Sequence, residues 1–261
     1  MRVPHRVDPT PEIRIVPDLA ALSREAARRF VGLAQQGVRE RGRFTVALSG
    51  GTTVEPLHAL LASEPSRHLM PWDQVHIFWG DERCLPVEHP ENNFRMAHDA
   101  LLSRVPIPAA SIHRVPVERG APEAVALAYE RTLRDFFALE EEKAVPEFDL
   151  ICLGLGTDGH AASLFPRSDA LRERHRWVVA TAGGMPRRPR VSLTIPVLNR
   201  ARHLVWLVAG SRKAAIVRSV LEGPESPDDL PAQQIRPIHT APLWLIDRAA
   251  ARLLTVQEVV G

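Results

Sequence analysis

The sequence predicts an α/β fold, an open, mostly parallel sheet with helices on both faces. Strand-like and helix-like segments alternate along the 261-residue chain. The strand-like segments are continuous apolar runs, which is the pattern of strands that are covered on both faces. Polar, glycine-rich segments come directly after strands, and open α/β sheets bind ligands at the carboxyl ends of their strands.

The first expected helix begins after Asp18, a residue type that caps helix N-termini. Its apolar residues recur every three or four positions, which is the period of a helix. These residues are Leu19, Leu22, Ala26, Phe30 and Leu33. Strands are expected at residues 44–48, 75–79 and 112–115. Helices are expected at residues 54–61 and 124–137, the second continuing through residues 140–143, three glutamates and a lysine.

The second half of the chain repeats this alternation. Strands are expected at residues 148–153, 177–180, 191–195, 204–208 and 243–246, and a helix at residues 211–221. Two segments rich in proline, residues 185–189 and 222–231, are typical of loops and not of linkers between domains. The sequence contains no internal repeat. We therefore expect a single domain that covers residues 1–261.

Composition excludes several classes of protein. Apolar residues make up 45% of the chain and charged residues 25%, which are ordinary values for a globular protein. The net charge of +2 requires neither a nucleic-acid nor a membrane partner. No apolar run is long enough to span a bilayer. Cys84 and Cys152 belong to no metal-binding or disulfide pattern, and the N-terminus lacks a signal peptide, so we expect a cytoplasmic protein.

The first segment that could carry chemistry is Ser49, Gly50, Gly51, Thr52 and Thr53, between a strand and a helix. Two glycines allow the backbone to turn tightly and to approach a ligand closely. Backbone N–H groups and hydroxyls at this point would suit a phosphate. The alternative is an ordinary strand-to-helix turn with a threonine cap.

Charged residues follow other strands. Asp81 and Arg83 lie in a run of three charges after a strand, which either pair with each other or meet a ligand. Arg190 shares one face of a strand with Ser192, and that strand could equally be half-exposed. Lys213, one of two lysines in the chain, lies in the first turn of a helix, where an anion would offset the unfavourable dipole.

Residues 154–160 read Gly-Leu-Gly-Thr-Asp-Gly-His and follow a buried strand. This segment is expected to enter a short helix, whose N-terminal dipole would favour the neutral form of His160. A neutral imidazole is what a general base requires. We assign His160 and Asp158 to catalysis and Gly159 to substrate binding. The alternative is a glycine-rich turn with a capping acid and a structural histidine.

These segments, in this order, resemble the 6-phosphogluconolactonase family. The most specific match is residues 154–166, and residues 49–53, 81–102, 190–199 and 210–213 fit as well. The resemblance spans roughly residues 12 to 255. Glucosamine-6-phosphate deaminases look like relatives, but their Asp-Gly-His core is followed by a further catalytic carboxylate. This chain has Leu-Phe-Pro at residues 164–166 instead.

The resemblance implies the fold of those deaminases and of ribose-5-phosphate isomerase. It implies hydrolysis of 6-phospho-D-glucono-1,5-lactone in the oxidative pentose phosphate pathway, without a cofactor or an essential metal. The expected partner is the sugar phosphate alone, bound by a monomer. Two other functions remain open: an amino-sugar-phosphate deaminase or isomerase, and a non-catalytic sugar-phosphate sensor.

Overall fold

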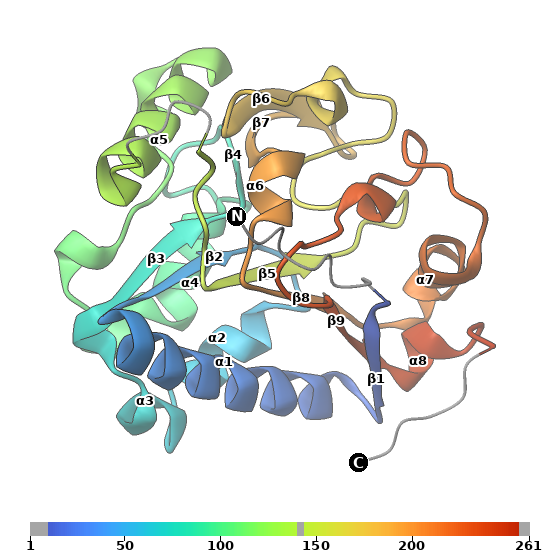
Figure 1. Ribbon diagram of the computed structural model, residues 1–261, viewed down its shortest axis with the longest axis horizontal. Helices are drawn as coiled ribbons and strands as arrows, with labels where there is room; N and C mark the ends of the chain where they lie inside the picture. The colour runs from blue at the N-terminus through green and yellow to red at the C-terminus, as the bar shows by residue number, and fades with distance from the viewer. Residues whose placement is uncertain (1–9, 140–143, 256–261) are drawn as a thin grey trace, which may run out of the picture.

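The structure is a computed structural model that describes residues 10–139 and 144–255. A six-stranded sheet lies at its centre, in the strand order β1-β9-β8-β5-β2-β3 (Figure 1). All five pairs of neighbouring strands are parallel. The strands are β1 (Glu12–Val16), β2 (Phe44–Leu48), β3 (Val75–Trp79), β5 (Leu150–Gly154), β8 (His203–Val208) and β9 (Leu243–Asp247).

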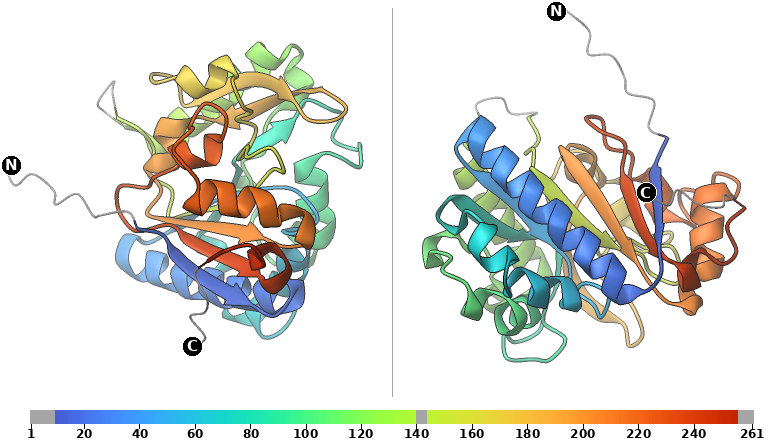
Figure 2. Two further views of the ribbon diagram at one scale, coloured as in Figure 1. Left: turned by 90° about the vertical axis from the view of Figure 1, so that its right-hand side faces the viewer. Right: turned by 90° about the horizontal axis from the view of Figure 1, so that it is seen from below.

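A second, smaller sheet is antiparallel and has the order β4-β7-β6. Its strands are β4 (Asp81–Arg83), β6 (Val178–Gly183) and β7 (Arg188–Leu193). Figures 1 and 2 show this sheet and helix α5 (Pro122–Phe137) on one side of the large sheet, with α1 (Leu19–Arg41) on the opposite side. Helical and sheet elements therefore cover both faces of the parallel strands.

The helices begin and end where local chemistry predicts. Asp18 caps α1, because its Oδ1 accepts a hydrogen bond from the N–H of Ala21 at 2.8 Å. Gly42 ends α1 with a left-handed φ of 72°. The remaining helices are α2 (Glu55–Leu61), α3 (Ser66–Leu69), α4 (Asn93–Ala100), α6 (Ile195–Asn199), α7 (Ala214–Glu222) and α8 (Arg248–Ala251). Within the described ranges, no helix is long and apolar enough to cross a membrane.

The predicted open, mostly parallel sheet is confirmed. All five residues of β2 and all five of β9 are buried, as their continuous apolar runs indicated. The predicted helix at residues 124–137 corresponds to α5, and its expected continuation through residues 140–143 lies outside the described residues. The predicted helix at residues 211–221 is a short 3₁₀ turn, Ser211–Lys213, followed by α7.

The strands of the structure differ from the expected ones in three respects. Residues 112–115 do not form a strand, and of these residues only Ile112 makes an isolated bridge, to Ile77. The segment lies between Pro108 and Pro116, which lack the N–H groups that a ladder of hydrogen bonds needs. The strands expected at residues 177–180 and 191–195 correspond to β6 and β7 of the antiparallel sheet and not to strands of the parallel one, and Ile195 already begins α6. β1 and β4 are strands that the sequence analysis did not predict.

Candidate active site

A cavity of about 310 Å³ lies at the carboxyl ends of the adjacent strands β2, β5 and β8. Its volume is at the lower end of the roughly 300–1,000 Å³ that is typical of small-molecule sites. The lining brings together most of the side chains and loops that the sequence analysis singled out. They are Ser49, Gly50, Gly51, Thr52, Thr53, Asp81, Arg83, His160, Arg190 and Lys213.

The loop at residues 49–53 forms one wall of the cavity. The backbone N–H groups of Gly50, Gly51, Thr52 and Thr53 have no acceptor among the described residues, and the two threonine hydroxyls have no partner there either. The Ser49 hydroxyl donates to the carbonyl oxygen of Cys152 at 2.7 Å, which ties the loop to β5. Unpaired donors around a concave loop are suited to the oxygens of an anion.

Gly50 is required by the packing of this loop. A Cβ atom at Gly50 would lie 1.9 Å from Oδ1 of Asn93, the first residue of α4. The Nδ2 atom of Asn93 donates to the backbone oxygen of Asp81 at 2.9 Å. Asn93 therefore joins the loop to β4. It lines the cavity, and the sequence analysis did not assign it to the site.

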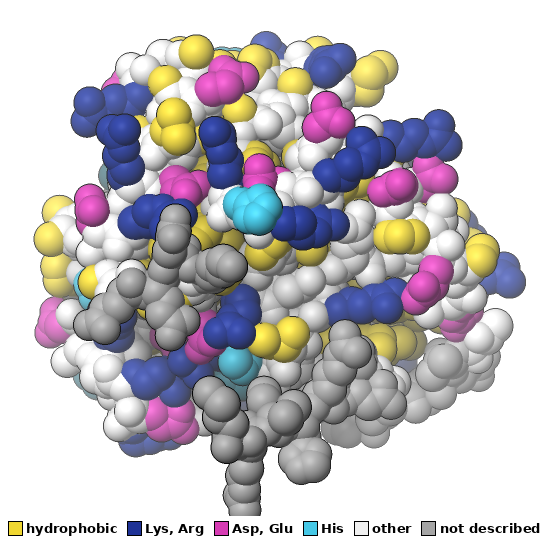
Figure 3. All heavy atoms as spheres, turned by 45° about the horizontal axis from the view of Figure 1, so that its top comes forward, with side chains coloured by type: hydrophobic (Ala, Val, Ile, Leu, Met, Phe, Trp, Pro, Cys, Tyr) yellow, Lys and Arg dark blue, Asp and Glu magenta, His cyan; other side chains and the backbone are white. Residues whose placement is uncertain are grey.

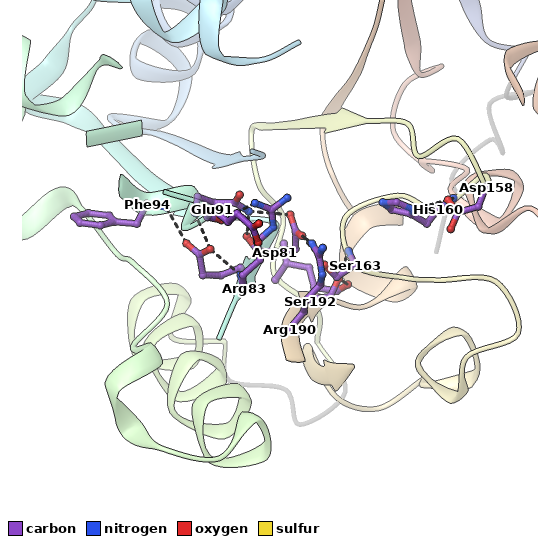
Figure 4. Close-up of polar contacts among 12 residues, drawn as sticks. Asp81, Arg83, Glu91, Phe94, Asp158, His160, Ser163, Arg190 and Ser192 are labelled. Carbon is purple, nitrogen blue, oxygen red and sulfur yellow. Dashed lines mark hydrogen bonds and ion pairs between the residues drawn. The ribbon is translucent and has the colours of Figure 1, made fainter. Parts of the chain in front are cut away.

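Asp81 lines the cavity, and its carboxylate is also held by other protein groups. Its buried carboxylate accepts the hydroxyl of Ser163 at 2.6 Å and the Nδ2 of Asn93 at 3.4 Å, and lies 4.0 Å from Arg190 (Figure 4). The carboxylate is thus occupied by protein groups. Asp81 links β4, α4, β7 and the segment that carries His160.

Three cationic side chains line the cavity, those of Arg83, Arg190 and Lys213, and among the described residues only one carboxylate lines it, that of Asp81. No nitrogen of the largely buried Arg190 guanidinium forms a hydrogen bond within the described chain, and its nearest acid is Asp81 at 4.0 Å. Burial lowers the pKa of Arg190, and the charge of Arg83 acts in the same direction. Arg83 donates from Nη1 to the backbone oxygen of Glu91 at 2.6 Å. The excess of positive charge favours an anionic ligand.

Lys213 contributes the third cation from the start of α7. Its Nζ donates to the carbonyl oxygen of Leu155, on the segment that leads to His160. Burial lowers the pKa of Lys213; the charge of Asp158 opposes this effect and that of Arg212 adds to it. Figure 3 shows basic side chains on both sides of a histidine on this face of the molecule.

His160 and Asp158 lie side by side, with His160 nearer to the group around Asp81 and Arg190 (Figure 4). The Nδ1 of His160 lies 2.5 Å from Oδ1 of Asp158. A carboxylate only accepts hydrogen bonds, so Nδ1 carries the proton and Nε2 of the neutral ring keeps its lone pair. Burial raises the pKa of Asp158, but the hydrogen bond and the charge of His160 outweigh it, and the pKa lies below its ordinary value. Asp158 itself does not line the cavity.

The expected helix after His160 is absent, so the proposed effect of a helix dipole on this imidazole is wrong. The chain instead forms a tight turn in which the N–H of Leu164 donates to the oxygen of Ala161. Ala162 takes a left-handed φ of 49°, and Pro166 follows. This backbone cannot continue into a helix. The orientation of His160 depends on Asp158 and on the ring of Phe165, whose centroid lies 4.6 Å away.

Two glycines in this segment have structural roles. A Cβ atom at Gly156 would lie 2.1 Å from Nδ1 of His160 and 2.5 Å from Oδ1 of Asp158, so only glycine leaves room for this pair. Gly159 has a φ of 85° and does not line the cavity, and its oxygen accepts from the N–H of Ala232. This φ is one that glycine adopts readily, and the assignment of Gly159 to substrate binding stays a prediction.

Other lining residues were not assigned to the site one by one, although some belong to the segment at residues 154–166. Leu155, Thr157, Ala162 and the end of β8 reach the cavity through their position in the fold. Ser163 holds Asp81 from a buried position, and it could have been found only by knowing that the two segments meet. Within the described ranges, no group of three His, Cys, Asp or Glu side chains is placed to hold a metal ion.

These features define an open α/β protein with a cationic cavity and an Asp–His pair at the carboxyl edge of its parallel sheet. The chain belongs to the glucosamine-6-phosphate isomerase/6-phosphogluconolactonase family, whose model matches residues 17–244. A 6-phosphogluconolactonase of Synechocystis sp. is 44% identical over 219 residues, which cover 84% of this chain and 88% of that protein.

Solved structures agree with this assignment. The 6-phosphogluconolactonase from Trypanosoma cruzi superposes with a TM-score of 0.84 at 29% sequence identity, covering 97% of this chain and all of that one. A monomeric glucosamine-6-phosphate deaminase has the same fold, with a TM-score of 0.78 at 20% identity, covering 93% of this chain and 99% of that one. The predicted likeness of this fold to that of the deaminases is therefore confirmed.

Proposed function

We propose that the protein is a 6-phosphogluconolactonase, which hydrolyses 6-phospho-D-glucono-1,5-lactone to 6-phospho-D-gluconate. The relatives that share the sequence over most of its length carry this name. The observation that carries the proposal is the pair of His160 and Asp158 at a cavity that holds three cations. A general base beside an anion-binding cavity is what hydrolysis of a phosphorylated lactone requires.

His160 acts as the general base in this proposal. Its Nε2 takes a proton from water, whose oxygen attacks the carbonyl carbon C1 of the lactone. The tetrahedral intermediate then collapses, the bond between C1 and the ring oxygen breaks, and protonated His160 donates its proton to that oxygen. Asp158 keeps the imidazole in the required tautomer and stabilises its charged form. A base in this position supplies about 10²–10⁴-fold in rate.

Two sets of hydrogen-bond donors bind different parts of the substrate. The unpaired N–H groups and hydroxyls at residues 49–53, together with Lys213, bind the 6-phosphate. Arg190 stabilises the oxyanion that forms at C1. One aromatic ring supports this assignment: Phe165 contacts His160 at 4.6 Å between centroids, and the Arg190 guanidinium lies 5.4 Å from the centroid of the same ring. The cation and the base therefore contact the same ring and line the same cavity.

The deciding experiment is turnover of freshly prepared lactone, with spontaneous hydrolysis subtracted, by the wild type and by His160→Ala. We expect the wild type to accelerate the reaction and His160→Ala to lose at least about a hundredfold in kcat while remaining folded. Equal turnover by both proteins would show that His160 is not the base. Release of ammonia from glucosamine 6-phosphate without lactone turnover would instead identify a deaminase.

We also propose that the enzyme acts as a monomer in the cytosol. The two cysteines, Cys84 and Cys152, are both free thiols, which suits a reducing compartment. Light scattering should give a mass near 29.0 kDa, and twice that mass would contradict the monomer.

A further inference from the structure

Glu82 is a buried acid that the proposed reaction does not use. It is 1% exposed, in the middle of β4 between Asp81 and Arg83. No side-chain nitrogen of a Lys, Arg or His in the described chain forms an ion pair with its carboxylate. Three backbone N–H groups bind it instead: Oε1 accepts from Arg83 at 2.7 Å and from Asn93 at 2.8 Å, and Oε2 accepts from Phe94 at 2.8 Å.

Two of these donors are the first N–H groups of α4, which have no partner within a helix. The carboxylate therefore attaches the first turn of α4 to β4. Asn93 in that turn contacts the loop at Gly50 and donates to the backbone of Asp81. A chain of contacts thus leads from the Glu82 carboxylate to the loop with the unpaired N–H groups.

We propose that Glu82 is a positioning residue of this site, whose ionised carboxylate holds α4 so that Asn93 supports the phosphate-binding loop. This inference rests on the proposed function, because the loop is the part of the site assigned to the 6-phosphate. Both carboxylate oxygens must accept for all three hydrogen bonds to form. Protonation places a hydrogen on one oxygen, and this donor then faces a backbone N–H that is also a donor.

Burial raises the pKa of Glu82 to about 7, although the hydrogen bonds from Asn93, Phe94 and Arg83 lower it. The protonated and ionised forms therefore exchange within the range in which the enzyme can be assayed. Charged and titratable groups face Glu82 from its own strand, from α5 and from β7. They are Asp81, Arg83, Cys84, Tyr129 and Arg190.

Glu82→Gln tests the proposal, because glutamine has the shape of the protonated side chain and cannot accept with both terminal atoms. We expect KM for the lactone, and Kd for 6-phosphogluconate measured by calorimetry, to rise about tenfold at pH 8.5 with little change in kcat. The ratio of variant to wild-type Kd should fall toward one below pH 6, where wild-type Glu82 is itself protonated. The titrations of His160 and of the phosphate are common to both proteins and cancel in this ratio.

Glu88→Gln is the matched control, since it removes an exposed carboxylate from the loop that follows β4. Its Kd should equal that of the wild type at every pH. Glu82→Asp, whose side chain is one methylene shorter, should raise Kd at pH 8.5, and its ratio to the wild-type Kd should likewise fall toward one at low pH. This second variant tests the proposal even if Glu82→Gln does not fold. A ratio that is constant with pH, or an unchanged Kd, would overturn the proposal. Failure of the wild type to bind 6-phosphogluconate at all would overturn the proposed function as well.

Discussion

Asp158→Asn replaces one carboxylate oxygen with an amide NH2 and should remove the control of the His160 tautomer. In the wild type, the carboxylate lies 2.5 Å from Nδ1 and can only accept, so the proton of the neutral ring stays on Nδ1. An amide can donate to Nδ1 instead, which moves the proton to Nε2, where the base must be free. The protonated imidazole also loses its neighbouring negative charge during the reaction.

The size of the effect follows from this one interaction. A hydrogen bond to a charged group contributes about 1.5–3 kcal/mol. Half of the Asp158 side chain is exposed, and solvent screens the interaction, so the lower part of that range applies. About 1.5–2 kcal/mol corresponds to a decrease in kcat of roughly ten- to thirtyfold. KM should not change, because Asp158 does not line the cavity.

Initial rates of lactone hydrolysis at several substrate concentrations separate kcat from KM. Asp228→Asn is the control, because Asp228 is exposed and its side chain has no hydrogen bond or ion pair in the described structure. In the His160→Ala background, Asp158→Asn should cause no further loss, since the two residues act as a unit. A kcat within twofold of the wild type, or a further loss in that background, would refute the role of Asp158.

Lys213→Ala should raise KM about ten- to a hundredfold and weaken product inhibition in step, because the 6-phosphate loses a charge-assisted hydrogen bond; an unchanged KM would remove Lys213 from the phosphate site. Treatment with a chelator should leave turnover unchanged, since no group of three potential ligands is placed for a metal within the described ranges; activity lost in chelator and restored by one divalent ion would contradict this. His58 is fully buried, both its nitrogens lack a partner in the described structure, and burial lowers its pKa to about 4. The folded state therefore favours the neutral form of His58. The stability that the protein has with neutral His58 is fully present above the unfolded pKa of about 6.5 and is lost as pH falls toward 4. The free energy of unfolding should fall by about 3 kcal/mol over that interval on account of His58, and His58→Leu should flatten this part of the profile in denaturant titrations; an unaltered profile would contradict the assignment.

The sequence by itself determined the elements whose signal is local. The period of the apolar residues and the cap at Asp18 predicted α1, and the apolar run at residues 44–48 predicted β2. The pair of Asp158 and His160 could be found because its members are two residues apart on one glycine-rich segment. A local pattern, however, also predicted a helix after His160. The chain forms a tight turn there, and Pro166 prevents a helix from continuing.

Only the tertiary structure decided how the charged residues are used. The run of charges predicted Asp81 as a substrate-binding residue and gave no sign of its protein contacts. Its carboxylate holds Ser163, 82 residues further along the chain, and lies 4.0 Å from Arg190. β4 is too short for a periodic signal and becomes a strand through pairing with β7, which lies after β6 in the chain. The surroundings of a buried carboxylate are made by segments that meet only in the folded state, and these contacts leave no pattern along the chain. The same physics places Glu82 under α4, where three backbone groups from two elements bind it.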